Sequence, residues 1–127
     1  MALLSIVLPS YNEEQNIANT AHVLSELLEK EAIDYELVFI SDGSSDNTFA
    51  EIKKAAAENP RIKGAQFSRN FGKEAAILCG MRHTTGEHVC FIDADMQQRP
   101  EVALEMYRKL LSDEDLDCVA AYQEQRK

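Results

Sequence analysis

The sequence predicts an α/β fold, a three-layer α/β/α sandwich built on a mostly parallel sheet. Short runs of apolar, β-forming residues alternate along the chain with stretches whose apolar residues recur at helical spacing. Two of the runs, Leu3–Leu8 and Tyr35–Ile40, are almost continuously apolar, as is typical of strands covered on both faces. Strict alternation of strand and helix requires crossover connections, which make the strands parallel. We therefore expect one open sheet with helices on both sides.

Five strands are expected, each bounded by polar or turn-forming residues. They are Leu3–Leu8, Tyr35–Ile40, Ile62–Phe67, His88–Ile92 and Cys118–Tyr122.

Four helices are expected between the strands. The first should begin with Asn12 and Gln15, a variant of the capping box. The second ends at Asn59-Pro60, the third covers Lys73 to about Arg82, and the fourth has Pro100 in its first turn. The apolar face of the first helix consists of Ile17, Ala21, Leu24 and Leu28.

Length and composition limit the possible functions. At 127 residues and 45% hydrophobic content, residues 1–127 should form a single domain with its own core. No apolar run approaches the roughly 20 residues of a membrane span, and the amino terminus lacks the features of a signal peptide. The net charge of −9 disfavours a nucleic-acid surface. Three cysteines without CxxC spacing favour a reducing, cytoplasmic setting over disulfides or a zinc site.

The chemically useful residues follow the strands. Ligands of open α/β sheets bind beyond the carboxyl ends of the strands, where the strand order reverses. The loops at that edge are Pro9–Glu13, Ser41–Thr48, Ser68–Lys73 and Asp93–Arg99, and all four are rich in polar side chains. The connections at the opposite edge, such as Glu31–Asp34 and Thr84–Glu87, read as plain turns.

Asp93 and Asp95 form a candidate metal site after the fourth strand. Residues two apart on an extended chain project to the same side, so both carboxylates can face one ion. Such hard oxygen ligands suit Mg²⁺ or Mn²⁺, and Gln97 continues the series with a neutral oxygen. The alternative is a pair of solvated aspartates at a strand end.

The other loops offer nucleotide ligands, each with a simpler structural explanation. Asp42 can accept from a ribose hydroxyl or a base N–H, whereas the residues after it can simply cap the second helix. Tyr11 can stack on a base, and Glu13 can bind base or ribose or merely complement a helix dipole. Arg69 or Lys73 can neutralise a diphosphate or remain solvated.

Taken together, the four loops resemble family 2 glycosyltransferases of the GT-A fold, in order and spacing over essentially the whole chain. The third and fourth segments are most similar to the polyprenyl-phosphate branch, and the bacterial bactoprenol type is the closer match. The matching segments are Val7–Glu14, Ile40–Thr48, Ser68–Ala76 and Ile92–Gln97.

This resemblance implies a Rossmann-like nucleotide-binding half and inverting transfer of a sugar from a nucleotide-diphospho-sugar to a polyprenyl phosphate. A UDP-sugar is favoured over a GDP-sugar by the resemblance alone. A saccharide hydroxyl as acceptor, or a nucleotide-binding module without transferase activity, stays open as an alternative. The nucleoside would be held by Pro9, Tyr11, Glu13 and Asp42, and Lys73 or Arg69 would lie near the phosphates. Mg²⁺ or Mn²⁺ would be bound by the catalytic Asp93 and Asp95 and by Gln97.

Members of this family continue beyond the fifth strand into an acceptor-binding half. We therefore expect this chain to be the N-terminal part of a longer protein at the cytoplasmic face of a membrane. The isolated chain is expected to bind nucleotide weakly and to turn over poorly.

Overall fold

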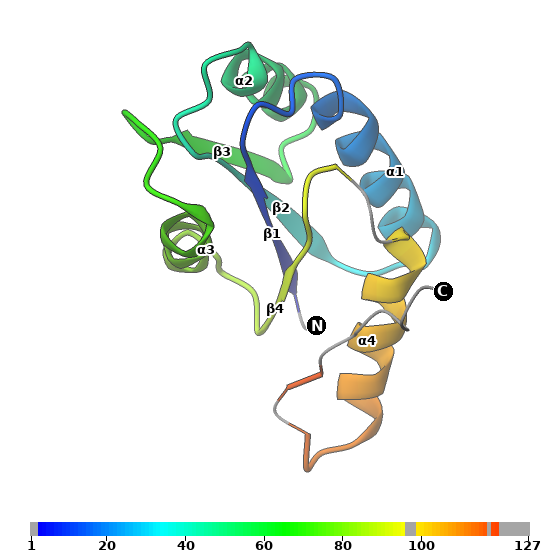
Figure 1. The fold of residues 1–127 in the computed structure, drawn as a ribbon. Coiled ribbons are helices and arrows are strands. Elements are labelled where there is room, and N and C mark those ends of the chain that lie inside the picture. Colours follow the sequence, from blue (N-terminus) through cyan, green and yellow to red (C-terminus); the bar gives the residue numbers. More distant parts are fainter. Residues whose placement is uncertain (1–2, 96–98, 117, 120–127) are drawn as a thin grey trace, which may run out of the picture.

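The computed structural model describes residues 3–95, 99–116 and 118–119, and it confirms the α/β class (Figure 1). Strands and helices alternate strictly along the described chain. They are β1 Leu4–Ser10, α1 Ile17–Lys30, β2 Tyr35–Ser41, α2 Thr48–Glu58, β3 Ile62–Gln66, α3 Lys73–Arg82, β4 His88–Phe91 and α4 Pro100–Ser112.

The sheet has the order β3-β2-β1-β4, and all of its described pairings are parallel. In register, Leu4 of β1 lies between Tyr35 of β2 and His88 of β4. The chain thus builds outward from β1 through β2 to β3 and then returns to the other side of β1. This reversal creates a switch point between β1 and β4, where open α/β sheets bind their ligands.

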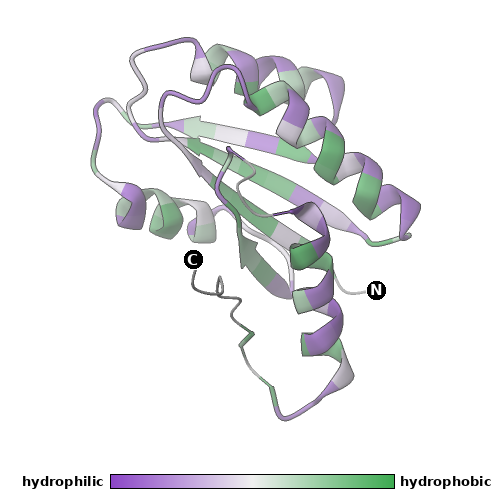
Figure 2. Cartoon of the chain, turned by 45° about the vertical axis from the view of Figure 1, so that its right-hand side comes forward, coloured by the Kyte–Doolittle hydropathy of each residue, from purple (hydrophilic) through white to green (hydrophobic). Residues whose placement is uncertain are grey.

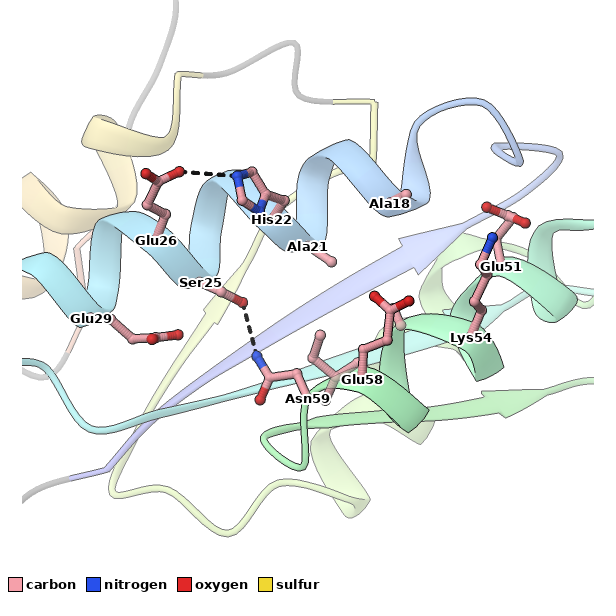
Figure 3. A pocket seen from close by; sticks show the side chains of 12 residues that line it. Ala18, Ala21, His22, Ser25, Glu26, Glu29, Glu51, Lys54, Glu58 and Asn59 are labelled. Carbon is pink, nitrogen blue, oxygen red and sulfur yellow. Dashed lines mark hydrogen bonds and ion pairs between the residues drawn. The ribbon is translucent and has the colours of Figure 1, made fainter.

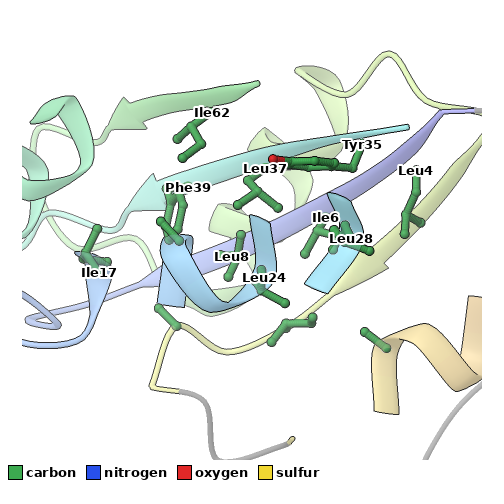
Figure 4. Packing of buried hydrophobic residues seen from close by; sticks show 14 of the residues in the cluster. Leu4, Ile6, Leu8, Ile17, Leu24, Leu28, Tyr35, Leu37, Phe39 and Ile62 are labelled. Atoms are coloured by element: carbon green, nitrogen blue, oxygen red, sulfur yellow. The ribbon is translucent and has the colours of Figure 1, made fainter. Parts of the chain in front are cut away.

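Both faces of the sheet are covered, which explains why its two central strands are almost continuously apolar. On one face, Leu4, Ile6 and Leu8 pack with Leu24 of α1 (Figure 4). Ile52 of α2 belongs to the same cluster. On the other face, Val7, Val38 and Ile40 pack with Ala76 of α3. Figure 2 shows the central strands as largely hydrophobic, with hydrophilic residues spread over the surrounding helices and loops.

Helix α3 approaches the sheet closely because a glycine faces β1. A Cβ atom on Gly80 would lie 2.3 Å from Cγ1 of Val7, far inside van der Waals contact. Gly80 and Ala76 therefore let α3 pack directly against this face of the sheet.

The amino-terminal edge of the sheet is closed around a buried carboxylate. Glu36 accepts hydrogen bonds from the Ser5 hydroxyl and the Thr85 N–H, both at 2.6 Å, and its Oε1 lies 2.6 Å from Nζ of Lys63. Burial raises the pKa of Glu36, but these partners outweigh burial and lower the pKa to about 2. The connection Thr84–Glu87, which reads as a plain turn in the sequence, is thus anchored by a charge on β2.

The helix boundaries confirm the predicted third helix and correct the start of the first. Helix α1 begins at Ile17 after the cap residue Asn16, so the predicted capping box of Asn12 and Gln15 is wrong. Asn12 instead has a φ of 52° and accepts a hydrogen bond from the Ser45 N–H, which removes it from the helix.

The first and last strands differ from prediction in other ways. β1 extends to Ser10, so the strand includes Pro9, which was expected in the loop. Of the predicted fifth strand, Cys118 and Val119 are not in a strand, and residues 120–122 lie outside the described residues. No helix in the described ranges has both the length and the apolar character of a membrane span.

Candidate functional site

The loops that follow the strands converge on a shallow pocket at the carboxyl edge of the sheet. Its volume is about 180 Å³. Among the described residues, every predicted site residue except Arg69 lines it. Gln97 lies outside the described residues. The pocket is lined by Pro9, Ser10, Tyr11, Glu13, Asp42, Lys73, Ala76, Asp93, Ala94 and Asp95.

The loop after β1 is bound to the loop after β2. The Asn12 N–H donates to the Ser44 hydroxyl at 3.1 Å, and the Asn12 side-chain oxygen accepts from the Ser45 N–H at 2.9 Å. The Glu13 N–H donates to the Thr48 hydroxyl at 2.8 Å. These bonds fix the backbone that carries Tyr11 and Glu13.

The two side chains at this corner differ in their exposure and partners. Tyr11 is 49% exposed, so one face of its ring can receive a planar ligand. The Glu13 carboxylate is partly buried and accepts from the Asn16 amide at 2.6 Å, next to the start of α1. Glu13 lies before the cap residue Asn16 rather than in the first turn of α1, and its carboxylate has a structural partner there. Tyr11 has the exposure expected of a stacking residue.

Asp46 lies at the amino end of α2 and has a structural role there. Its carboxylate accepts from the Thr48 N–H at 2.9 Å. Burial raises the pKa of Asp46, but hydrogen bonds from the hydroxyl and N–H of Thr48 outweigh it and lower the pKa below its usual range. The cap residue Asn47 makes no side-chain cap bond, so within this loop it is the Asp46 carboxylate that binds the first N–H of α2.

Asp42 has a structural role that the sequence pattern did not reveal. Its carboxylate is buried and accepts from the Phe71 N–H at 2.7 Å, the Gly72 N–H at 3.0 Å and the Asn70 amide at 3.2 Å. The adjacent Gly43, at a φ of 64°, allows the close approach, because a Cβ atom there would lie 2.1 Å from the Arg69 carbonyl carbon. Asp42 therefore holds the loop that leads into α3.

These partners lie 28 to 30 residues from Asp42 in the chain, which is why no local motif indicated them. Arg69, the alternative to Lys73 near the phosphates, does not line the pocket. Its guanidinium lies over the Phe71 ring, 4.7 Å from the ring centroid.

The carboxylates after β4 lie on either side of an anchored residue. Ala94 is buried, and its carbonyl oxygen accepts from the Thr20 hydroxyl of α1 at 2.7 Å. Asp93 and Asp95 flank it and both line the pocket. Nζ of Lys73, the first residue of α3, lies 2.6 Å from Oδ1 of Asp93.

The donor set at this edge fits a hard divalent cation. Asp93 and Asp95 supply carboxylate oxygens, the ligands that such a cation prefers. The Asp93 carboxylate already pairs with a positive charge in the pocket, the Lys73 ammonium. Within the described ranges, no group of three or more His, Cys, Asp or Glu side chains could hold a metal ion. Such an ion would therefore need oxygens from a bound phosphate or from water as well.

A second pocket lies between α1 and α2, away from these loops. It has a volume of about 470 Å³ and an acidic lining that includes Glu26, Glu29 and Glu58 (Figure 3). Two pairs of its polar groups are in contact, His22 with Glu26 at 3.1 Å and Asn59 with Ser25 at 3.3 Å. The pocket at the carboxyl edge is thus the one that contains the predicted nucleotide and metal ligands.

Comparison with known proteins identifies the family of this chain. Residues 5–127 match the family model of Glycosyl transferase family 2. The chain belongs to this family. This confirms the resemblance inferred from the four loops.

Two relatives illustrate the match. The chain is 50% identical over 95 residues to CsbB of Bacillus subtilis, which is named as a putative glycosyltransferase. The match covers 75% of this chain and 29% of the relative. It is 38% identical over 113 residues to the bactoprenol glucosyl transferase of Shigella phage SfX. That match covers 89% of this chain and 37% of the relative. The chain thus spans about a third of the length of these family 2 relatives.

Solved structures agree on the fold. A mannosyltransferase of Pyrobaculum calidifontis in complex with GDP-Man and Mn²⁺ matches with a TM-score of 0.71 and 26% identity, over 87% of this chain and 32% of that one. The glucosyl-3-phosphoglycerate synthase of Mycobacterium tuberculosis, in complex with Mn²⁺, UDP and glucosyl-3-phosphoglycerate, matches with a TM-score of 0.67 and 25% identity. That match covers 89% of this chain and 41% of the synthase.

Proposed function

We propose that this chain is the donor-binding half of an inverting glycosyltransferase that moves a sugar from a nucleotide-diphospho-sugar to a polyprenyl phosphate. The observation that carries the proposal is the convergence of the predicted ligands in one pocket at the switch point of the sheet. The named activity of the bactoprenol glucosyl transferase relative supports the lipid-phosphate acceptor. UDP and GDP-Man in two structural neighbours support a nucleotide-sugar donor, and we favour a UDP-sugar.

In this proposal the nucleoside lies against Pro9 and Tyr11, with Glu13 and Asp42 at its polar edge. The half-exposed Tyr11 ring provides the stacking surface. Asp42 contributes mainly by holding the loop before α3, because its carboxylate already accepts from three groups of that loop. The Lys73 ammonium is near enough to the same pocket to approach the diphosphate.

Mg²⁺ or Mn²⁺ would be held by Asp93 and Asp95, with Gln97 as a further oxygen ligand. Both structural neighbours described above contain Mn²⁺. When bound, such an ion neutralises negative charge that develops on the departing nucleoside diphosphate. It also explains how a chain with a net charge of −9 can bind an anionic donor.

The two candidate acceptors differ in their need for a base. A phosphate oxygen is a nucleophile near neutral pH without a strong base, whereas a saccharide hydroxyl needs a carboxylate to take its proton. The chain spans about a third of its relatives, so we base the preference for a polyprenyl phosphate on the named activity of the bactoprenol glucosyl transferase relative.

For the full-length protein we propose a position at the cytoplasmic face of a membrane, where a lipid phosphate and a nucleotide-sugar can meet.

The proposal is tested by the thermal midpoint of the chain with UDP or GDP, each with and without Mn²⁺. A ligand at about 100 times its dissociation constant stabilises by about 2.7 kcal/mol. For a domain of this size that corresponds to roughly 10 °C. We expect a Mn²⁺-dependent shift with one nucleotide that is lost in Asp95→Ala and kept in Asp115→Ala, an exposed aspartate beyond α4.

Each outcome has a distinct meaning. A Mn²⁺-dependent shift with one nucleotide identifies the base and the role of Asp95. No shift with either nucleotide, in a cooperatively folded sample, contradicts a donor site in this chain. With a nucleotide-sugar and a polyprenyl phosphate, the isolated chain should turn over poorly. Rapid transfer would show that the acceptor site is already complete, and binding without any transfer by the full-length protein would favour a nucleotide-binding module.

A further inference from the structure

The pocket at the carboxyl edge contains a positively charged side chain, the ammonium of Lys73. Nζ of Lys73 lies 2.6 Å from Oδ1 of Asp93, across the gap between the start of α3 and the end of β4. We infer that Lys73 is the resident counter-ion of Asp93, and that it gives up this carboxylate when a divalent cation and a nucleoside diphosphate bind. This inference rests on the proposed function of the pocket.

The ion pair is built to exchange. The Lys73 side chain is 60% exposed and the Asp93 side chain 48% exposed, so water can solvate both groups when they separate. Exposed pairs of this kind are weak, since solvation and side-chain entropy offset most of the attraction. A divalent cation, with twice the charge, can therefore compete for the same carboxylate.

The backbone of Lys73 is fixed even though its ammonium can move. The Asp42 carboxylate binds the Phe71 and Gly72 N–H groups at 2.7 and 3.0 Å, directly before α3 begins. A lysine at the first position of a helix lies at the positive end of the helix dipole, where an anion is favoured and a cation is not. An anionic partner therefore stabilises the Lys73 ammonium at this position, and Asp93 is that partner in the empty pocket.

The geometry couples metal and nucleotide binding. Asp93 cannot hold the ammonium at 2.6 Å and a divalent cation at the same time without bringing two positive charges together. The resident lysine therefore opposes metal binding to the empty pocket. Once a diphosphate is present, the ammonium has a new anionic partner, so Lys73 should favour nucleotide binding. A residue that only maintained the fold would affect both events in the same direction.

The test measures Mn²⁺ binding and nucleotide binding separately. The free Mn²⁺ signal in electron paramagnetic resonance gives the metal affinity without nucleotide, and calorimetry gives UDP and GDP affinity at saturating Mn²⁺. The variants are Lys73→Met, the charge-conserving Lys73→Arg, and Lys109→Met on the exposed far end of α4. Lys73→Met and Lys109→Met lower the net charge of −9 by the same single unit.

For Lys73→Met we expect Mn²⁺ alone to bind about fivefold more tightly, which corresponds to about 1 kcal/mol. The favoured nucleotide should bind several-fold more weakly at saturating Mn²⁺. Lys73→Arg should return both affinities toward wild type, and Lys109→Met should change neither. Opposite shifts in the two affinities would support the inference.

Two other outcomes would overturn it and are distinguishable. If wild type binds the Mn²⁺–nucleotide complex but Lys73→Met binds Mn²⁺ alone no more tightly, Lys73 is not the competing counter-ion and the proposed function is unaffected. If wild type binds neither Mn²⁺ nor either nucleotide, both the inference and the donor site are wrong.

Discussion

Replacing Asp42 separates its structural role from a role as ligand. In the nucleotide-free chain, Asp42→Ala removes the acceptor of the Phe71 and Gly72 N–H groups and of the Asn70 amide. A hydrogen bond to a charged group contributes about 1.5–3 kcal/mol. Water can rehydrate part of this exposed loop, so we expect a total loss of about 3 kcal/mol rather than the full sum.

The assay is urea and thermal unfolding without nucleotide. A loss of about 3 kcal/mol lowers the thermal midpoint by roughly 10 °C for a domain of this size. Asn70→Ala removes one of the three donors and should cost about 1 kcal/mol in wild type. In the Asp42→Ala background it should cost almost nothing, because its partner is already gone. Asp42→Asn, which keeps one acceptor oxygen, should fall between wild type and Asp42→Ala.

A purely ligand-binding Asp42 gives a different result. Its removal would then leave the nucleotide-free chain within about 0.5 kcal/mol of wild type, as for ordinary surface substitutions. That outcome, or an unchanged cost of Asn70→Ala in the Asp42→Ala background, would refute the assignment of Asp42 as the anchor of the loop before α3.

Three further results are expected. Because the pKa of Glu36 is lowered from 4.5 to about 2, its stabilising effect is complete above pH 4.5 and is lost as the pH falls toward 2. Unfolding monitored by circular dichroism should thus show roughly 3 kcal/mol of acid destabilisation in this range that Glu36→Gln lacks. Gly80→Ala should lower the free energy of unfolding, measured in urea, by about 1–3 kcal/mol, because the added Cβ atom would lie 2.3 Å from Val7. An unchanged free energy of unfolding would mean that α3 can shift away from the sheet without cost. Burial raises the pKa of Cys90 to about 11, so a thiol reagent at pH 8 should modify exposed Cys118 first and Cys90 slowly, and equal rates would contradict this.

The fold could be predicted because its signals are local. The continuous apolar runs of β1 and β2 reflect burial on two faces, with Leu8 in the cluster under α1 and Val7 in the cluster under α3. The third helix was predicted from Lys73 to about Arg82, and α3 has those bounds. The predicted start of α1 was wrong because the Asn12 side chain accepts a hydrogen bond from Ser45, 33 residues away, instead of capping the helix.

The site could be predicted only as a set of residues. Parallel strands end at one edge, so the polar residues after each strand were expected to meet, and Tyr11, Asp42 and Asp93 do line one pocket. The pattern could not show which of them are already engaged. The contacts of Asp42 with Phe71 and of Lys73 with Asp93 join separate loops, and such pairings depend on the packed sheet rather than on spacing.

The bonds between the loops after β1 and β2 affect the thermodynamics of ligand binding. Asn12 and Glu13 are already bonded to Ser44, Ser45 and Thr48 without a ligand. The conformational entropy of the β1–α1 loop is therefore lost when the protein folds, and a nucleoside that arrives there orders little additional backbone. We therefore expect the heat-capacity change of nucleoside binding, measured by calorimetry, to arise mostly from the surface that the base and Tyr11 bury. Ordering of the loop should contribute little to it.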